Sequence, residues 1–296
     1  MIARTAKLDY KMNYLVVRSG DDIKRVFLDD IDTIIISTTA VSLTAYLLCE
    51  LANHKINVVF CDQKGMPNGQ YLPYYGSHDT SRKIDKQVQW DIAVQLKVWK
   101  FIITRKISGQ AAVLKKQGLQ EACDKLLGYI SEINDGDSSN REGHAAKVYF
   151  NALFGKDFSR SDKENPINAE LNYGYAILLS LVAREIVANG YITQIGIHHI
   201  NVYNEYNLAC DLMEPFRPFV DAYVLGMNHK NFGKEEKEYL VKILDIPVIV
   251  GGKEFYLSNA VSMYVKSITD ALCNDMEEEI KYPEYELSLY ATNSVF

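Results

Sequence analysis

The hydrophobic period of the sequence changes near residue 78, and this change limits the possible folds more than any other feature. Before it, short runs rich in Val, Ile and Phe are separated by turn residues, as in "MNYLVVRS", "DTIIIST" and "INVVFCD". Such runs predict β-strands. After it, apolar residues recur every three or four positions, which predicts amphipathic helices. We therefore expect an α+β chain, with a small β-rich N-terminal domain over residues 1–77 and a larger all-helical domain over residues 78–296.

Two local signals refine the N-terminal part. Leu43, Leu47 and Leu51 follow one another at four-residue spacing, which predicts one short helix over residues 39–55. Asn68-Gly69 is a favoured pair for a tight hairpin turn. We therefore expect the chain to reverse direction there.

The helical part contains two long patterns. After residue 80, a single stripe of apolar side chains predicts one long amphipathic helix; its members are Ile84, Val88, Ile92, Leu96 and Trp99. The segment "NPINAELNYGYAILLSLVAREIVANGY" is apolar around most of its circumference, starts at Pro166 and ends near Gly190. A helix of this kind is expected at the centre of the fold.

Composition excludes several classes of protein. The net charge of the 296 residues is −6, which argues against a simple nucleic-acid coating protein, although residues 76–125 hold ten Lys or Arg against five Asp or Glu. The five cysteines form no CxxC pair, so we expect buried thiols rather than disulfides or a zinc ribbon. No run of about 18 apolar residues and no signal-peptide pattern is present, so we expect a cytoplasmic protein with no membrane partner.

Three polar positions stand out within the helical part. Glu142 is the second residue of "REGHAAKVYF", His198 and His199 are adjacent in a short connection, and Asp211 and Glu214 lie three residues apart in an apolar stretch. Each has an ordinary explanation when taken alone. A glutamate in a first helical turn suits the helix dipole, adjacent histidines are common in connections, and the two acids would be solvated at the edge of an amphipathic helix.

A helix would place Asp211 and Glu214 on nearly the same face. Pro215 follows immediately, and proline is poorly tolerated inside a helix. Either the helix is kinked here, or a new helix begins at Pro215 with Glu214 near its cap. Carboxylates beside a packed core are costly unless another charge neutralises them.

Considered together, the three positions predict a metal site. One imidazole and several carboxylates, with no thiolate, fit Mg²⁺ or Mn²⁺ better than zinc. Such a site leaves coordination positions for water and phosphate oxygens, which metal-assisted phosphodiester chemistry requires.

At these residues the sequence resembles the CRISPR-associated integrase family, the first-numbered Cas proteins, and most closely the branch found beside single-chain, RNA-guided effector nucleases (type II systems). Three segments carry the resemblance: "NREGHAAKVYFNALFG" (140–155), "NAELNYGYAILLSLVAR" (168–184) and "GIHHINVYNEYNLACDLMEPFRPFVD" (196–221).

The resemblance implies a ligand set for the metal. The glutamate of the family falls on Glu142, the histidine on His199 with His198 at the variable position, and the ligand acid on Glu214, with Asp211 as a second catalytic acid. The implied ion is Mg²⁺ or Mn²⁺.

The resemblance also implies a reaction and partners. In this family a 3′-hydroxyl of incoming spacer DNA attacks a phosphodiester at the leader–repeat junction of a CRISPR array, which is a transesterification. The protein would form a homodimer through its N-terminal domain, and two dimers would clasp a dimer of the small second-numbered Cas protein in a heterohexamer. The effector nuclease and an accessory ring-forming Cas subunit are further candidate partners.

Several basic residues are candidates for contact with double-stranded DNA: Arg141, Arg217, Lys83 and Lys86, with Arg105, Lys106, Lys115 and Lys116 along the same positive segment. A solvated helix face or an ion pair explains each of them equally well. Two alternatives to the integrase stay open at this point: a stand-alone metal-dependent nuclease acting on branched DNA, and a non-catalytic DNA-binding scaffold.

Overall fold

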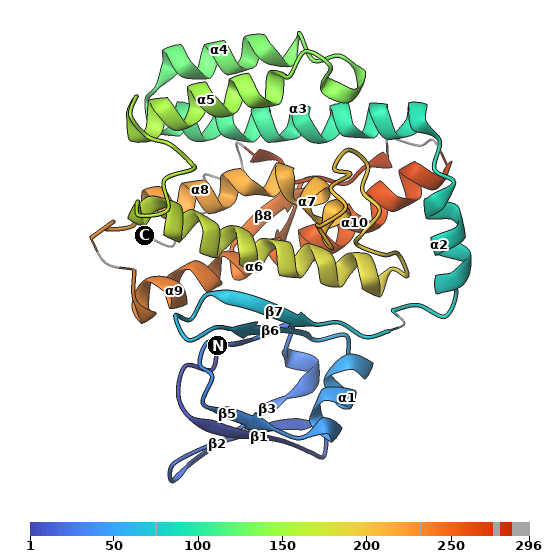
Figure 1. The fold of residues 1–296 in the computed structure, drawn as a ribbon, viewed down its shortest axis with the longest axis vertical. Helices are drawn as coiled ribbons and strands as arrows, with labels where there is room; N and C mark the ends of the chain where they lie inside the picture. Colours follow the sequence, from blue (N-terminus) through green and yellow to red (C-terminus); the bar gives the residue numbers. More distant parts are fainter. Residues whose placement is uncertain (75, 231, 275–278, 286–296) are drawn as a thin grey trace.

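The computed structural model describes residues 1–74, 76–230, 232–274 and 279–285. The molecule is built in layers along its longest axis (Figure 1). A β-rich N-terminal layer lies at one end, a layer of helices around the long apolar helix lies in the middle, and three further helices cover the other end. The change of period near residue 78 therefore marks a real change of architecture.

The N-terminal layer holds two sheets and one helix. The first sheet has the strand order β3-β2-β1-β5 and the second has the order β4-β6-β7. The strands are β1 (Ala6–Lys11), β2 (Tyr14–Ser19), β3 (Asp22–Phe27), β4 (Thr33–Ile36), β5 (Val41–Leu43), β6 (Asn57–Cys61) and β7 (Pro67–Tyr71). Helix α1 (Ala45–Asn53) is shorter than the segment predicted, because Val41–Leu43 pairs with β1 as a strand and Thr44 caps the helix through its side chain.

The expected hairpin exists, but its turn is not at Asn68-Gly69. Strands β6 and β7 pair in antiparallel fashion, and Asn68-Gly69 lies inside β7. The turn is made by Asp62, whose carboxylate accepts hydrogen bonds from the backbone N–H groups of Lys64 and Met66 at 2.8 and 2.9 Å, and by Gly65 in the left-handed region (φ +69°). An Asp side chain that satisfies the local N–H groups fixes the turn more strongly than a residue-pair preference does.

The rest of the described chain is mainly helical. Its helices are α2 (Thr80–Val88), α3 (Ile92–Lys116), α4 (Gln120–Ile130), α5 (Arg141–Phe154), α6 (Pro166–Ala188), α7 (Asn207–Met213), α8 (Arg217–Leu225), α9 (Lys234–Val241) and α10 (Leu257–Asn274), with 3-10 turns η2 (Asp135–Asp137), η3 (Glu214–Phe216) and η4 (Lys242–Asp245). A further 3-10 turn, η1 (Leu28–Asp30), lies in the N-terminal layer. The expectation of an all-helical second part is corrected by one small hairpin, β8 (Pro247–Val250) and β9 (Lys253–Tyr256).

The predicted stripe after residue 80 is correct at Trp99, which is buried, but wrong at Val88, Ile92 and Leu96, which are exposed. The chain breaks between α2 and α3, where the Asp91 carboxylate caps α3 by accepting from the N–H groups of Ala93 and Val94. The break changes the phase of the two helices, so Val88 and Ile92 are 64% and 72% exposed. The buried face of α3 contains Trp99 together with residues outside the predicted stripe: Val98, Ile102, Ile103, Lys106, Ile107 and Gln110.

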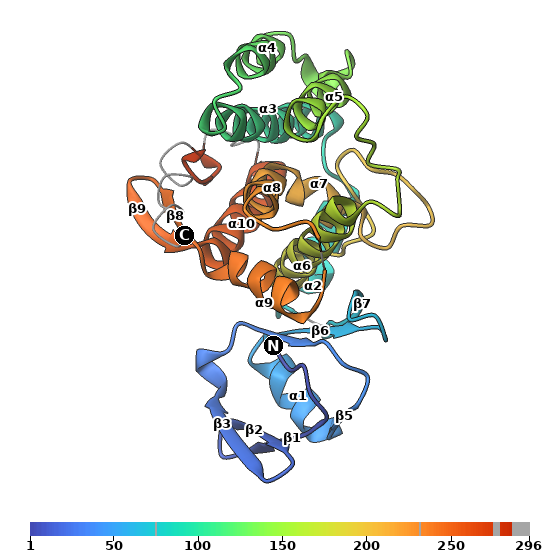
Figure 2. The same cartoon turned by 90° about the vertical axis from the view of Figure 1, so that its left-hand side faces the viewer.

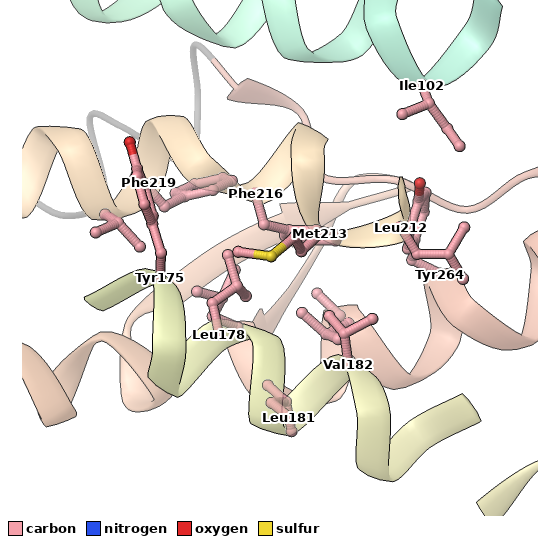
Figure 3. Packing of buried hydrophobic residues seen from close by; sticks show 14 of the residues in the cluster. Ile102, Tyr175, Leu178, Leu181, Val182, Leu212, Met213, Phe216, Phe219 and Tyr264 are labelled. Atoms are coloured by element: carbon pink, nitrogen blue, oxygen red, sulfur yellow. The ribbon is translucent and has the colours of Figure 1, made fainter. Parts of the chain in front are cut away.

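Helix α6 is the centre of the fold, as its sequence predicts. Figure 3 shows side chains of α7, η3 and α8 packed over it, including Met213, Phe216 and Phe219 above Leu178 and Val182. By length and composition alone α6 could cross a membrane, but 67% of its most apolar window is buried inside the fold. Its hydrophobicity is therefore explained by core packing.

The cysteines are only partly as expected. Cys61 and Cys123 are buried, whereas Cys210 and Cys273 are half-buried and Cys49 is exposed on α1. The exposed position arises because α1 is amphipathic and buries the side that carries Leu47 and Leu51.

A buried polar contact joins the N-terminal layer to α6. The Asn57 side chain, fully buried, donates to the Ser180 hydroxyl at 3.2 Å and accepts from the Gln70 amide at 2.6 Å. The Gln70 amide also donates to the Ser180 carbonyl at 2.6 Å. The orientation of the β4-β6-β7 sheet against α6 is thus fixed by hydrogen bonds as well as by apolar contact.

Asn57→Ala is expected to lower the free energy of unfolding by about 2 kcal/mol, because it leaves buried polar groups without their partner. Urea unfolding of the purified protein measures this. Asn68→Ala, in the same sheet but exposed, is the matched control and should change stability by less than about 0.5 kcal/mol. Equal effects of the two substitutions would contradict this account of the junction.

Candidate active site

Glu142 is held at the first turn of α5 by two caps. The Asn140 side chain, at a residue with φ +50°, accepts from the N–H of Gly143 at 3.2 Å. The buried Asp137 carboxylate accepts from the N–H groups of Arg141 and Glu142 at 2.8 and 2.9 Å. These contacts fix the direction in which α5 begins, and therefore the position of the Glu142 side chain.

Asp211 anchors the connection between α6 and α7. Its fully buried carboxylate accepts from three successive backbone N–H groups, those of Ile197 (2.6 Å), His198 (3.0 Å) and His199 (3.1 Å). It also pairs with Nδ1 of the His199 ring. The two acids that a helix was expected to place on nearly the same face therefore have different partners: Asp211 is bonded to the loop and holds it, whereas Glu214 is bonded to Arg217 and Lys106.

The two histidines have different environments. His198 is exposed and stacks on Trp99 of α3, with ring centroids 4.2 Å apart and planes 3° from parallel. His199 meets the edge of the same indole at 6.0 Å and is bonded to Asp211 through Nδ1. Because Nδ1 is engaged, Nε2 is the nitrogen left to bind another group.

Glu214 is the first residue of the 3-10 turn η3, and Pro215 is the second. Helix α7 ends at Met213, η3 follows, and α8 begins at Arg217. This resolves the two alternatives: the proline neither kinks a continuous helix nor begins α8 itself, but opens a short turn between two helices. Arg217 Nε donates to Glu214 Oε1 at 2.8 Å, so one carboxylate oxygen is held in place.

Lys106 completes the cluster; it was expected only as a candidate for DNA contact, but it is buried and paired with Glu142 and Glu214. Its Nζ donates to Glu142 Oε1 at 2.6 Å and forms an ion pair with Glu214 Oε2. Burial lowers the pKa of this lysine, but Glu214 and Glu142 outweigh it and the pKa is raised. Burial raises the pKa of Glu214, but the positive charges of Arg217 and Lys106 outweigh this effect and bring the pKa below its usual value. Lys106 and Glu214 are therefore both charged at neutral pH.

The imidazole of His199 belongs to the same electrostatic cluster. Its hydrogen bond with Asp211 raises the pKa of His199, burial opposes this, and the charges of Glu214 and Glu142 add to the increase. The structure thus brings Glu142, Glu214 and His199 within electrostatic reach of one another, from α5, η3 and the loop before α7. In Figure 2 that loop lies on the same side of the molecule as α5.

The donors present fit a divalent cation. Two carboxylates already share one buried cation, the ammonium of Lys106, and an imidazole with Nδ1 fixed by a carboxylate is the usual form of a metal-bound histidine. No three His, Cys, Asp or Glu side chains in the described parts of the chain already surround a common cation position. The ammonium therefore stands between the carboxylates where an oxygen-binding ion would be expected.

A second buried network lies behind Glu214. Arg217 places its guanidinium 4.5 Å from the ring centre of Tyr175, and the Tyr175 hydroxyl donates to Asp221. Burial raises the pKa of Asp221 to about 6, against the lowering effects of Tyr175, Tyr149, Arg217 and Arg160. Asp221 is therefore a buried acid that costs stability when it ionises.

Asp221→Asn is expected to gain stability relative to the natural chain as pH rises from 4 to 7. Because the folded pKa lies above the unfolded value of 3.8, the Asp221 contribution is fully present below pH 4 and is lost as pH rises through 6, a change of about 3 kcal/mol. Guanidinium unfolding of both proteins at several pH values measures it. A difference between the two proteins that stays constant over this range would show that Asp221 ionises normally.

The four basic residues proposed for DNA are not equivalent. Arg217 holds Glu214 and is half-buried, so it is part of the cluster. Arg141 pairs with Glu132 at 3.0 Å and lies over the Tyr129 ring. On α2, Lys83 pairs with Asp79 at 3.2 Å and Lys86 is exposed. A role in DNA binding stays a prediction for all four.

Comparisons with known proteins are consistent with this geometry. The family model described as "CRISPR associated protein Cas1" matches residues 1–240. A relative named CRISPR-associated endonuclease Cas1, from Neisseria meningitidis serogroup C, is 33% identical over 289 residues, covering 96% of this chain and 95% of the relative.

Two solved structures share the fold. A casposase bound to an integration product superposes with a TM-score of 0.74 at 22% identity, covering 93% of this chain and 90% of that one. A Cas6-RT-Cas1–Cas2 complex superposes with a TM-score of 0.68 at 20% identity, covering 92% of this chain and 34% of that one.

Proposed function

Because the chain belongs to the CRISPR-associated Cas1 family, we propose that it is a metal-dependent DNA integrase that inserts spacer DNA into a CRISPR array. The observation that carries this proposal is the cluster of Glu142, Glu214 and His199. Two carboxylates from separate segments, Glu142 and Glu214, pair with the ammonium of Lys106, and both influence the electrostatics of the His199 imidazole, which comes from a third segment.

In this proposal Glu142, Glu214 and Nε2 of His199 hold Mg²⁺ or Mn²⁺. The bound ion would lower the pKa of the attacking hydroxyl and offset charge on the phosphate. Asp211 keeps the imidazole oriented through Nδ1, and Arg217 keeps one Glu214 oxygen fixed.

The proposed reaction is a transesterification. A 3′-hydroxyl of the incoming DNA attacks a phosphodiester at the leader–repeat junction, so that one P–O bond forms and the P–O bond to the leaving 3′-oxygen breaks. The hydroxyl proton is transferred away and the leaving oxygen gains a proton. The number of phosphodiester bonds is unchanged, so the reaction needs no energy source and is reversible. Hydrolysis at the same site would give endonuclease activity.

The proposed partners follow from the family and from the neighbouring structures. The casposase structure contains an integration product, and the Cas6-RT-Cas1 chain is solved with Cas2. We propose that this chain binds double-stranded DNA, dimerises through its β-rich N-terminal layer and forms a heterohexamer with a dimer of the small second Cas protein. The effector nuclease and a ring-forming Cas subunit would dock on that assembly in the cytoplasm.

One experiment separates the integrase from its alternatives. The protein and its small Cas partner are incubated with Mg²⁺ or Mn²⁺, a short duplex with 3′-hydroxyl ends, and a supercoiled plasmid that carries a repeat. Joined products support the integrase, and their loss in EDTA supports the metal requirement. Cleavage without joining would favour a stand-alone nuclease, and binding without either would favour a scaffold.

A further inference from the structure

Lys106 is a buried lysine on an otherwise apolar helix face. It lies on the apolar face of α3, between Ile102, Ile103 and Ile107, and its side chain is only 9% exposed. A lysine in such a place is costly unless its charge is compensated. Compensation comes from Glu142 at 2.6 Å and from Glu214 in an ion pair.

The charges of this cluster balance without any bound ion. Arg217 and Lys106 offset Glu214, and Lys106 also offsets Glu142. Glu214 is 5% exposed and Glu142 is 26% exposed, so the open side of the cluster is that of Glu142. Lys106 therefore keeps two carboxylates, which would otherwise repel each other, close together and ready to bind a cation.

A divalent ion bound by both carboxylates would have to occupy the position that the Lys106 ammonium now occupies. Two cations a few ångströms apart repel strongly in a buried site, and each carboxylate oxygen has a limited number of lone pairs. Binding of the ion and the ion pairs of Lys106 are therefore mutually exclusive.

We propose that Lys106 is a built-in counterion of this site, which must leave Glu142 and Glu214 before a divalent ion can be held there. This inference rests on the function proposed above. Lys106 is a positioning residue in this scheme: it preserves the arrangement of the carboxylates in the absence of the ion and raises the ion concentration needed to load the site.

The first test measures Mn²⁺ affinity by calorimetry and by electron paramagnetic resonance. Lys106→Met is expected to bind Mn²⁺ about tenfold more tightly than the natural chain or better, because no competing charge pair has to be broken. In EDTA the variant should melt at a lower temperature, since its carboxylates are then uncompensated, and Mn²⁺ should restore most of the loss. Lys106→Gln serves if Lys106→Met does not fold.

Two control variants show that position and charge both matter. Lys106→Arg keeps the charge and should bind Mn²⁺ no more tightly than the natural chain. Lys100→Met removes an exposed lysine of the same helix, which pairs with Asp135 at 3.1 Å, and should leave the affinity unchanged. An affinity of Lys106→Met equal to or weaker than that of the natural chain would overturn the proposal.

The second test detects the movement of the ammonium itself. Acetic anhydride labelling followed by mass spectrometry should modify Lys106 slowly in EDTA and faster in Mn²⁺, whereas labelling of Lys100 should not change. Equal labelling of Lys106 in both conditions would exclude the exchange. These readouts are independent of DNA joining, so a natural chain that exchanges Lys106 but joins no DNA would overturn only the proposed function.

Discussion

Asp211→Asn is expected to reduce strand joining about a hundredfold, although Asp211 is not among the proposed metal ligands. The carboxylate accepts hydrogen bonds from three successive backbone N–H groups and is hydrogen-bonded to Nδ1 of His199. An asparagine keeps one acceptor oxygen and turns an amide NH₂ toward these donors, so the loop loses its anchor and the imidazole loses its fixed orientation.

Two measurements identify this mechanism. Hydrogen exchange at the amides of residues 197–199 should become faster in Asp211→Asn, and the affinity for Mn²⁺ should fall together with the rate of joining. Glu185→Gln, which neutralises another buried carboxylate on α6, is the matched control and should preserve both properties. Normal exchange at these amides in Asp211→Asn would contradict the anchoring role.

His199→Ala should have the largest effect on the reaction, a loss of joining of about a thousandfold or more, because it removes one of three proposed ligands. His198→Ala is the natural comparison, since the neighbouring ring stacks on Trp99 and, within the described parts of the chain, forms no ion pair with an acid. It should retain joining within about tenfold, the loss being that of a surface stacking contact.

The assignment depends on the contrast between these variants. Both should dimerise and melt within a few degrees of the natural chain, because neither side chain lies in the core. If His198→Ala abolished joining and His199→Ala did not, the assignment of His199 as the ligand would be wrong. The proposed role of Asp211 in orienting His199 would then be wrong as well.

Much of the fold follows from the hydrophobic period. The strands of the N-terminal part and the central position of α6 are predicted from local patterns that tertiary packing agrees with. The stripe through Val88 and Ile92 fails because Asp91 caps a new helix, and a cap of one residue shifts the phase of everything after it. The prediction of a turn at Asn68-Gly69 fails because Asp62 and Gly65 form the turn earlier, within residues 62–66.

The site was predictable in a more limited way. Glu142, His199 and Glu214 are suggested by the resemblance, and spacing alone left each with an ordinary explanation. The role of Asp211 could not be read from a three-residue spacing, because its partners are the backbone N–H groups of residues 197–199, in a loop that the spacing does not place. Lys106 had a signal: it falls on the buried face of α3, which becomes visible once the helix is known to begin at Ile92.

The central claim is that one divalent ion replaces the Lys106 ammonium between side chains from three separate segments. Anomalous diffraction from crystals soaked in Mn²⁺ tests it most directly. We predict a single strong peak within about 2.3 Å of Glu142, Glu214 and His199 Nε2, with Lys106 withdrawn from both carboxylates. A peak elsewhere, or an undisturbed Lys106 between Glu142 and Glu214 at saturating Mn²⁺, would contradict it.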